Sequence, residues 1–188
     1  MGNLILLGII LAAVFYVLYV RLIKIRNKVK ESASDIDVQL KKRYDLIPNI
    51  LRTAAKFMEH EKSLMTELTE LRTKAMETTF SASPKEKMEL ENLLNQKLSE
   101  FKVSLENYPD LKSNQTMITA MQSMNEVEEH ISAARRFYNS NVTALKDAVE
   151  IFPSSVVAKM LNITYADNPF FEIAESERKP IDTRDFFK

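Results

Sequence analysis

The stretch LILLGIILAAVFYVLYV, residues Leu4–Val20, contains seventeen consecutive residues without a charge. A helix of this length spans roughly 26 Å, which is close to the ~30 Å hydrocarbon core of a bilayer. Tyr16 and Tyr19 lie at its C-terminal edge, where aromatic side chains favour the membrane interface. The stretch therefore predicts a transmembrane anchor over residues 1–21.

A basic segment, called here the basic collar, follows the apolar stretch directly and contains no acidic residue. Its members are Arg21, Lys24, Arg26, Lys28 and Lys30. Because basic residues flanking a membrane helix stay on the cytoplasmic side, the collar predicts a single-pass protein with a three-residue N-terminus outside and the remainder in the cytoplasm. The collar is also suited to anionic lipid headgroups, at about 1 kcal/mol per residue. A cleaved signal peptide is the alternative, but it requires basic residues before the apolar stretch and small residues at a cleavage site.

The composition of the remaining chain excludes several kinds of chemistry. The only two glycines of the sequence, Gly2 and Gly8, are among its first eight residues, so the remaining chain has none, and the sequence contains no cysteine. Glycine-rich phosphate loops, thiolate nucleophiles and cysteine-ligated zinc are therefore not expected. His60 and His130 lack the Glu-x-x-His spacing of di-iron bundles. Residues 31–188 hold 21 basic and 26 acidic residues, so nucleic acid is not an expected partner. No catalytic residue, metal site or cofactor is predicted.

Four segments after the anchor repeat apolar residues at spacings of three and four, which is typical of amphipathic helices. They extend from the anchor to Tyr44, from Ile50 to Ala75, from Leu90 to Tyr108 and from Met121 to Phe152. Short connections force neighbouring helices to be antiparallel. The prediction is an all-α protein, with an N-terminal transmembrane helix followed by an antiparallel up-down four-helix bundle over residues 22–163.

Polar residues and prolines predict where these helices begin. Asp45 is a candidate N-cap for the second helix, with Pro48 and Asn49 in its first turn, so a turn between the first and second helices is expected here. Ser83–Glu86 reads as a capping box with proline at the first helical position of the third helix.

The C-terminal boundaries follow from similar signals. Ser113 or Asn114 is expected to cap the fourth helix. Pro153 is expected to end it, with a short helix following over residues 154–161. Residues 164–188 read as an extended tail whose phenylalanines dock either on the bundle or on a partner.

Three charged residues fall on the apolar faces with which the predicted helices pack against one another, called here the apolar seams. Glu61 interrupts the seam of the second helix, and Glu128 and Arg135 interrupt that of the fourth. Because a buried charge needs a partner, we expect these residues to form one polar layer, with Asn139 one turn further on. Such a layer either specifies helix register or forms a functional site.

Several motifs resemble the LemA family of bacterial membrane proteins. They are IDVQLKKRYDLIPN at 36–49, His60-Glu61, YPDLK at 108–112, ARRFYN at 134–139, Phe152-Pro153-Ser154 and Phe170-Phe171-Glu172. The resemblance covers nearly the whole chain. It implies a single-pass protein with an antiparallel four-helix bundle and no established enzymatic activity. The chain departs from the family pattern at Leu145-Lys146, Ser155 and Lys159, which puts in doubt any role that depends on that end of the bundle.

Three functions remain open at this point. The leading one is a membrane-anchored interaction or scaffold protein at the bacterial cell membrane, which contacts the lipid bilayer and an unidentified protein partner. The second is a ligand-binding or catalytic bundle that uses the polar layer and the Asp45/Asn49 turn. The third is a self-associating structural protein at the membrane surface, a homo-oligomer acting through its basic collar.

Overall fold

The structure is a computed structural model that describes residues 1–172. Within this range the chain is helical and contains no strand, so the all-α prediction is confirmed. The helices are α1 (Gly2–Ala54), η1 (Glu59–Glu61), α2 (Lys62–Glu77), α3 (Pro84–Leu105), α4 (Pro109–Lys112), α5 (Gln115–Glu150) and α6 (Ser154–Met160). The predicted docking of Phe186 and Phe187 concerns residues outside the described range.

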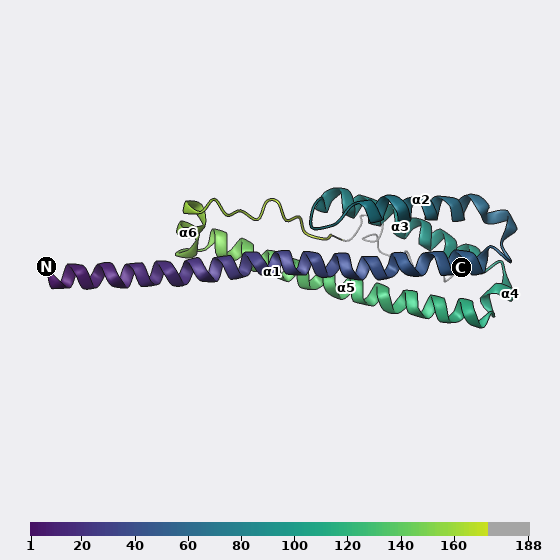
Figure 1. Cartoon of the computed structure of the whole chain (residues 1–188), viewed down its shortest axis with the longest axis horizontal. Helices are drawn as coiled ribbons and strands as arrows, with labels where there is room; N and C mark the ends of the chain where they lie inside the picture. Colours follow the sequence, from purple (N-terminus) through teal and green to yellow (C-terminus); the bar gives the residue numbers. More distant parts are fainter. Residues whose placement is uncertain (173–188) are drawn as a thin grey trace, which may run out of the picture.

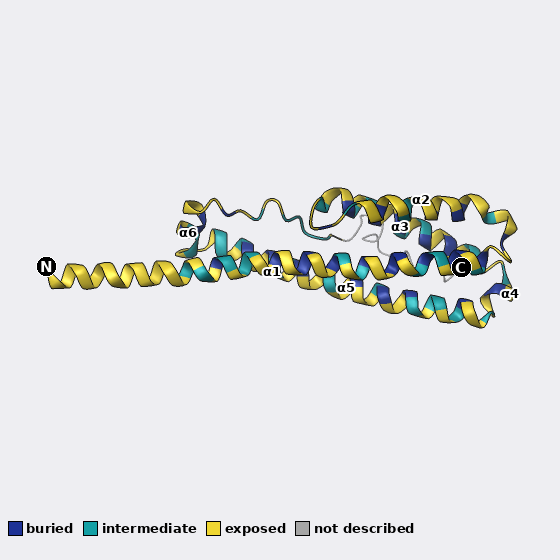
Figure 2. Cartoon of the chain, viewed as in Figure 1, coloured by how far each residue is buried: buried dark blue, intermediate teal, exposed yellow. Residues whose placement is uncertain are grey.

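Helix α1 is 53 residues long, about 80 Å from end to end, and has two parts. Its N-terminal part extends beyond the rest of the molecule (Figure 1), and every side chain from residue 1 to residue 17 is exposed (Figure 2). The first buried side chain is Leu22. Within residues 1–172, α1 is the helix that is long and apolar enough to cross a membrane. The N-terminal apolar helix is therefore a candidate membrane anchor.

The predicted turn at Asp45, Pro48 and Asn49 is wrong, because all three residues lie inside α1. Asp45 does not cap a helix, and instead its carboxylate accepts from Lys41 Nζ at 2.6 Å on the exposed surface. Asn49 is also exposed. The helix that was expected to begin at Asp45 begins at Lys62, after the connection 55–61.

The continuation of α1 past Pro48 has two physical causes. The buried stripe of the helix keeps its four-and-three spacing through this point, at Leu40, Arg43, Ile47, Ile50 and Ala54. The proline has no N–H to donate to the carbonyl of Tyr44, four residues earlier. Arg72 of α2 supplies that donor instead, with its Nε 2.7 Å from the Tyr44 carbonyl oxygen.

Helices α2 and α3 form a hairpin beside the C-terminal half of α1 (Figure 1). Helix α3 begins at Pro84, as the capping-box motif predicts, but Ser83 makes no side-chain capping bond. Helix α5 then packs antiparallel along α1. Its N-cap is Asn114, whose side-chain oxygen accepts from the N–H groups of Thr116 and Met117 at 3.0 and 3.3 Å.

The chain after α5 turns sharply at Pro153 into α6, as predicted. Helix α6 ends at Met160, and Asn162, two residues later, has a φ of 51°. The N–H of Ile163 donates to the carbonyl of Ala158 at 3.0 Å. This is a Schellman ending, in which a residue with positive φ closes the helix. The following segment runs back along the molecule and packs Phe170 and Phe171 against the core. Docking of these two tail phenylalanines on the chain's own helices is therefore confirmed.

Candidate functional site

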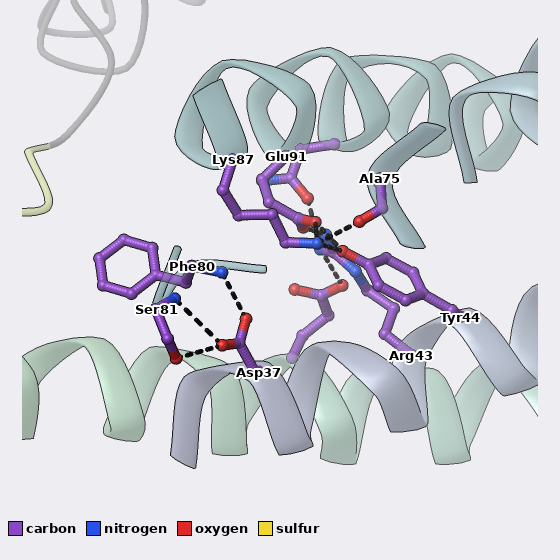
Figure 3. A network of polar contacts seen from close by, with 10 residues as sticks. Asp37, Arg43, Tyr44, Ala75, Phe80, Ser81, Lys87 and Glu91 are labelled. Atoms are coloured by element: carbon purple, nitrogen blue, oxygen red, sulfur yellow. Dashed lines mark hydrogen bonds and ion pairs between the residues drawn. The ribbon is translucent and has the colours of Figure 1, made fainter. Parts of the chain in front are cut away.

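The structure buries four ionisable side chains between α1 and α3. Arg43 and Tyr44 come from α1, and Lys87 and Glu91 come from α3 (Figure 3). All four are between 0% and 3% exposed. We call these four residues the buried network. Charged side chains are seldom buried unless they are paired, so the network is the most unusual chemical feature of the described residues.

Arg43 forms the centre of the network. Its Nη2 pairs with Glu91 Oε2, and its Nη1 lies 3.0 Å from Glu128 Oε1 of α5 and 2.6 Å from Asn95 Oδ1 of α3. One guanidinium group thus joins three helices. Two carboxylates surround this cation, and Glu128 is partly open to solvent.

Lys87 forms the second half of the network. Its ammonium group donates to the Tyr44 hydroxyl at 2.7 Å and to the backbone carbonyl of Ala75, where α2 nears its end. It also lies 3.5 Å from Glu91 Oε1. The Tyr44 hydroxyl donates to the same carboxylate oxygen. Two cations and two carboxylates therefore balance within a set of contacts that joins all four long helices.

Burial shifts the pKa of two members of the network. Desolvation lowers the pKa of the Lys87 ammonium to about 8, with the nearby Asp37 charge opposing the shift and the Arg43 charge adding to it. Desolvation also raises the pKa of the Tyr44 hydroxyl, against the effect of the adjacent Arg43. Tyr44 is therefore neutral at physiological pH and acts as a donor.

The predicted polar layer exists only in part. Glu128 does enter a buried charged cluster, but with Arg43 as its partner. Glu61 lies in η1, before α2, and lines a surface cleft together with residues of α3. Arg135 and Asn139 contact the tail instead of Glu61. The expected grouping of Glu61 with Arg135 is wrong because the second long helix begins at Lys62 and not near Asp45. Glu61 therefore lies in the connection between α1 and α2, at the end of the molecule far from the N-terminal apolar helix (Figure 1).

Arg135 and Asn139 hold the segment that follows α6. The Asn139 side chain donates to the Phe171 carbonyl and accepts from the Phe171 N–H, each at 2.9 Å. The Arg135 guanidinium lies 5.0 Å from the centre of the Phe171 ring. That ring stacks on Phe80 and meets Tyr138 edge-on. These two predicted site residues therefore serve as a clamp on the C-terminal segment.

A carboxylate on α1 organises the α2–α3 connection in the same region (Figure 3). Asp37 accepts from the N–H of Phe80 at 2.6 Å and from the hydroxyl of Ser81 at 2.7 Å. These bonds place the Phe80 ring against Phe171 and Tyr138. The α2–α3 connection, the tail and α5 thus meet in one aromatic cluster.

The sequence contains a signal for Lys87 and Glu91 that the apolar pattern alone does not reveal. The buried residues of α3 are Lys87, Glu91, Leu94, Leu98, Phe101 and Leu105. Their spacing alternates four and three without exception. Extending the seam backwards from Leu94 would therefore have identified both charged residues, just as extending the α1 seam through Leu40 identifies Arg43.

The basic collar lies on α1 immediately after the exposed apolar part. Arg21, Lys24, Lys28 and Lys30 are exposed. Arg26 is half-buried and lines, with Lys30, a cleft of about 660 Å³ between α1, the α2–α3 connection and residues 161–168. Among residues 1–172, no group of three or more histidine, aspartate or glutamate side chains is arranged to hold a metal ion.

These features define a class of protein: an all-helical domain joined without a break to an exposed apolar N-terminal helix, with a buried charged network between its helices. Residues 32–184 match the LemA family, and the chain belongs to it. It is similar to Protein LemA of Metamycoplasma hominis, with 23% identity over 183 residues that cover 95% of this chain and 82% of the relative. Family and apolar helix together indicate a membrane-associated protein.

Proposed function

We propose that this chain is a single-pass membrane protein whose residues 22–163 form one up-down four-helix bundle, used as a rigid interaction platform on the cytoplasmic side. Helix α1 belongs to both the proposed anchor and the proposed bundle, because its exposed apolar residues and the residues packed against α5 lie on one uninterrupted helix. A partner held by the bundle would therefore be held at a defined distance from the membrane.

The burial of the charged network is the observation that carries this proposal. A catalytic or ligand-binding site needs contact with its substrate, whereas Arg43, Tyr44, Lys87 and Glu91 are almost completely excluded from solvent. Their charges are used to pair with one another across the helices. Such a network supports a fixed helix register, which an interaction platform requires and which an open active site would not provide.

The proposed orientation is tested with cysteine accessibility, because the chain has no cysteine of its own. Val103 is exposed on α3, far from the anchor, so Val103→Cys introduces one thiol on the bundle. In intact bacterial spheroplasts, a membrane-impermeant maleimide should label this thiol only after lysis. The matched control is Asn3→Cys, on the opposite side of the apolar stretch, which should be labelled before lysis. The reverse pattern would contradict the cytoplasmic platform.

The platform itself is tested by site-specific photo-crosslinking in cells. A photoreactive residue replaces Leu93 or Val103 on α3, or Phe137 on α5, all of which are exposed apolar side chains. We expect positions on a single face to crosslink one reproducible protein partner. If the buried network sets the shape of that face, the crosslinking yield should be lost in a Glu91→Gln variant. A photoreactive residue at Leu11, in the apolar helix, controls for contacts made by the anchor alone. Self-crosslinks at every position would instead favour a self-associating structural protein.

A further inference from the structure

The turn between α5 and α6, together with α6, exposes large apolar side chains to the outside. We call residues 151–160 the elbow. Ile151 is 59% exposed and Phe152 is 77% exposed, and on α6 the exposed Val156 and Met160 lie one turn apart on the same face. The opposite face of α6 is already used, because Val157 and Ala158 are buried. The outer face is therefore not required for packing within the described chain.

The elbow lies beside the part of α1 where the exposed apolar stretch ends. Residues Ile151–Ser154 share a cleft with Leu18, Arg21, Leu22 and Ile25 of α1. These α1 residues begin where the exposed apolar stretch ends, and they cover about 10 Å along the helix axis. The headgroup region flanking the hydrocarbon core is of similar thickness, on the order of 5–8 Å on each side. Figure 1 shows α6 beside α1 at the border between its free and its packed parts.

The elbow is flanked by basic side chains of α1 and α6 and by acidic side chains at the end of α5. Lys159 on α6 and the collar residues Arg21 and Lys24 are exposed at this level. Interfacial segments combine apolar side chains, which enter the headgroup and acyl boundary, with basic side chains that remain among the headgroups. The exposed apolar side chains of the elbow thus lie beside the end of the apolar stretch of α1, with Arg21 and Lys159 as basic neighbours and Asp147 and Glu150 as acidic ones.

We propose that the elbow inserts Ile151, Phe152, Val156 and Met160 into the membrane interface, as a second attachment beside the transmembrane helix. A single helix leaves the bundle free to rotate about the helix axis. A second contact at the side of that axis removes this freedom and fixes which face of the bundle points along the membrane. The inference rests on the proposed membrane anchoring, and the experiment separates the two.

The test uses tryptophan fluorescence, because the chain has no tryptophan. Three full-length variants are prepared, Phe15→Trp in the apolar stretch, Phe152→Trp in the elbow and Phe137→Trp on α5. Each is reconstituted into phosphatidylcholine/phosphatidylglycerol vesicles with or without phosphatidylcholine brominated on its acyl chains. Phe137 is the matched control, because it is also an exposed phenylalanine but lies about 20 Å further along α5. Circular dichroism verifies that each variant keeps its helical content.

We expect bromolipid to quench Phe15→Trp and Phe152→Trp strongly and to leave Phe137→Trp unchanged. If Phe15→Trp is quenched and Phe152→Trp behaves like the control, the elbow proposal is overturned while the anchor remains. If Phe15→Trp is not quenched, the anchoring proposal fails as well. A blue-shifted but unquenched Phe152→Trp would show that protein covers the elbow, which also overturns the proposal. Val156→Trp, on the exposed face of α6, repeats the measurement at a second position if Phe152→Trp loses its helical content.

Discussion

Arg43 lies on the buried face of α1, between the apolar side chains of Leu40 and Ile47. Removing a guanidinium from water costs several kcal/mol, and carboxylates at close range offset this cost. Glu91 and Glu128 provide that compensation from two other helices. The intact set of charges therefore contributes little net stability. The loss of one partner, by contrast, is strongly destabilising, because it leaves a buried charge unpaired.

The first prediction concerns Glu91, the most buried carboxylate of the network. Glu91→Gln removes the anion shared by Arg43 and Lys87, and we expect the free energy of unfolding to fall by about 3 kcal/mol. Urea unfolding of the full chain in detergent micelles, followed by circular dichroism, measures the change. Glu89→Gln is the control, because Glu89 is exposed on the same helix. Equal stability of the two variants would contradict the assigned role of Glu91.

The second prediction concerns the pH dependence that Lys87 introduces. Its pKa is about 8 in the folded chain, against an ordinary value of 10.5. Between pH 8 and 10 the unfolded chain therefore binds more protons than the folded chain, so stability should rise with pH by at most about 1.4 kcal/mol per unit. Unfolding measured across this range should show the rise in the parent chain, and Lys87→Met should remove it. Above pH 10 the raised pKa of Tyr44 acts in the opposite direction.

At the scale of secondary-structure elements, the passage of α1 through Pro48 depends on a contact from another helix. The proline cannot donate to the Tyr44 carbonyl, and Arg72 of α2 donates to it at 2.7 Å. A buried carbonyl without a donor is destabilising, so this contact favours the continuous helix over a turn.

The third prediction is a coupling between these two positions. Arg72→Met should destabilise the chain by about 1–3 kcal/mol, because it leaves the Tyr44 carbonyl without its donor. Pro48→Ala restores a backbone N–H within α1, so the same Arg72 substitution should cost clearly less in that background. A double-mutant cycle of unfolding free energies measures the difference. Strictly additive effects would contradict the compensation.

The fourth prediction concerns the C-terminal segment held by Asn139. Its side chain makes two bonds of 2.9 Å to the backbone of Phe171. Asn139→Ala should raise the hydrogen-exchange rate of the Phe171 amide by about 10–30-fold, as expected for the loss of two hydrogen bonds worth about 1 kcal/mol each. Ser140→Ala, a neighbouring exposed residue on α5, is the control. Unchanged exchange at Phe171 in Asn139→Ala would show that the aromatic contacts suffice.

At the scale of the whole molecule, the charge is distributed unevenly along a chain whose net charge is zero. Five basic residues form the collar beside the apolar stretch, and an acidic excess occupies the remainder. Four of the five collar side chains are exposed, so they contribute little to packing and are available to set orientation in a membrane.

The fifth prediction tests this role of the collar. Lys24→Glu/Lys28→Glu should reduce correctly oriented insertion, so that Val103→Cys becomes labelled by the impermeant maleimide before lysis in a substantial fraction of molecules. Lys85→Glu/Lys102→Glu makes the same change in net charge at exposed positions on α3 and should leave labelling unchanged. An equal effect of both pairs would indicate a response to net charge alone and would contradict an orientation signal located in the collar.

The sequence by itself determined the helical class, the exposed apolar stretch and the starts of α3 and α6, and it limited the cap of α5 to Ser113 or Asn114, of which Asn114 is used. Each of these depends on residues close together in the chain. Helical periodicity reveals which face is apolar, and capping requires a side chain within a few residues of the helix end. A seam extended through its charged members would also have identified Arg43, Lys87 and Glu91 as buried.

Only the tertiary structure decided which charges meet and where α1 ends. Arg43 pairs with Glu91 and Glu128 because the offset between helices brings these residues to one level, and that offset depends on where each helix begins. Because α1 continues past Pro48, Glu61 lies at the end of the molecule far from the apolar stretch, whereas Arg135 contacts Phe171. The physical reason is that local patterns specify faces, whereas donors such as Arg72, supplied by a distant part of the chain, specify partners and helix ends.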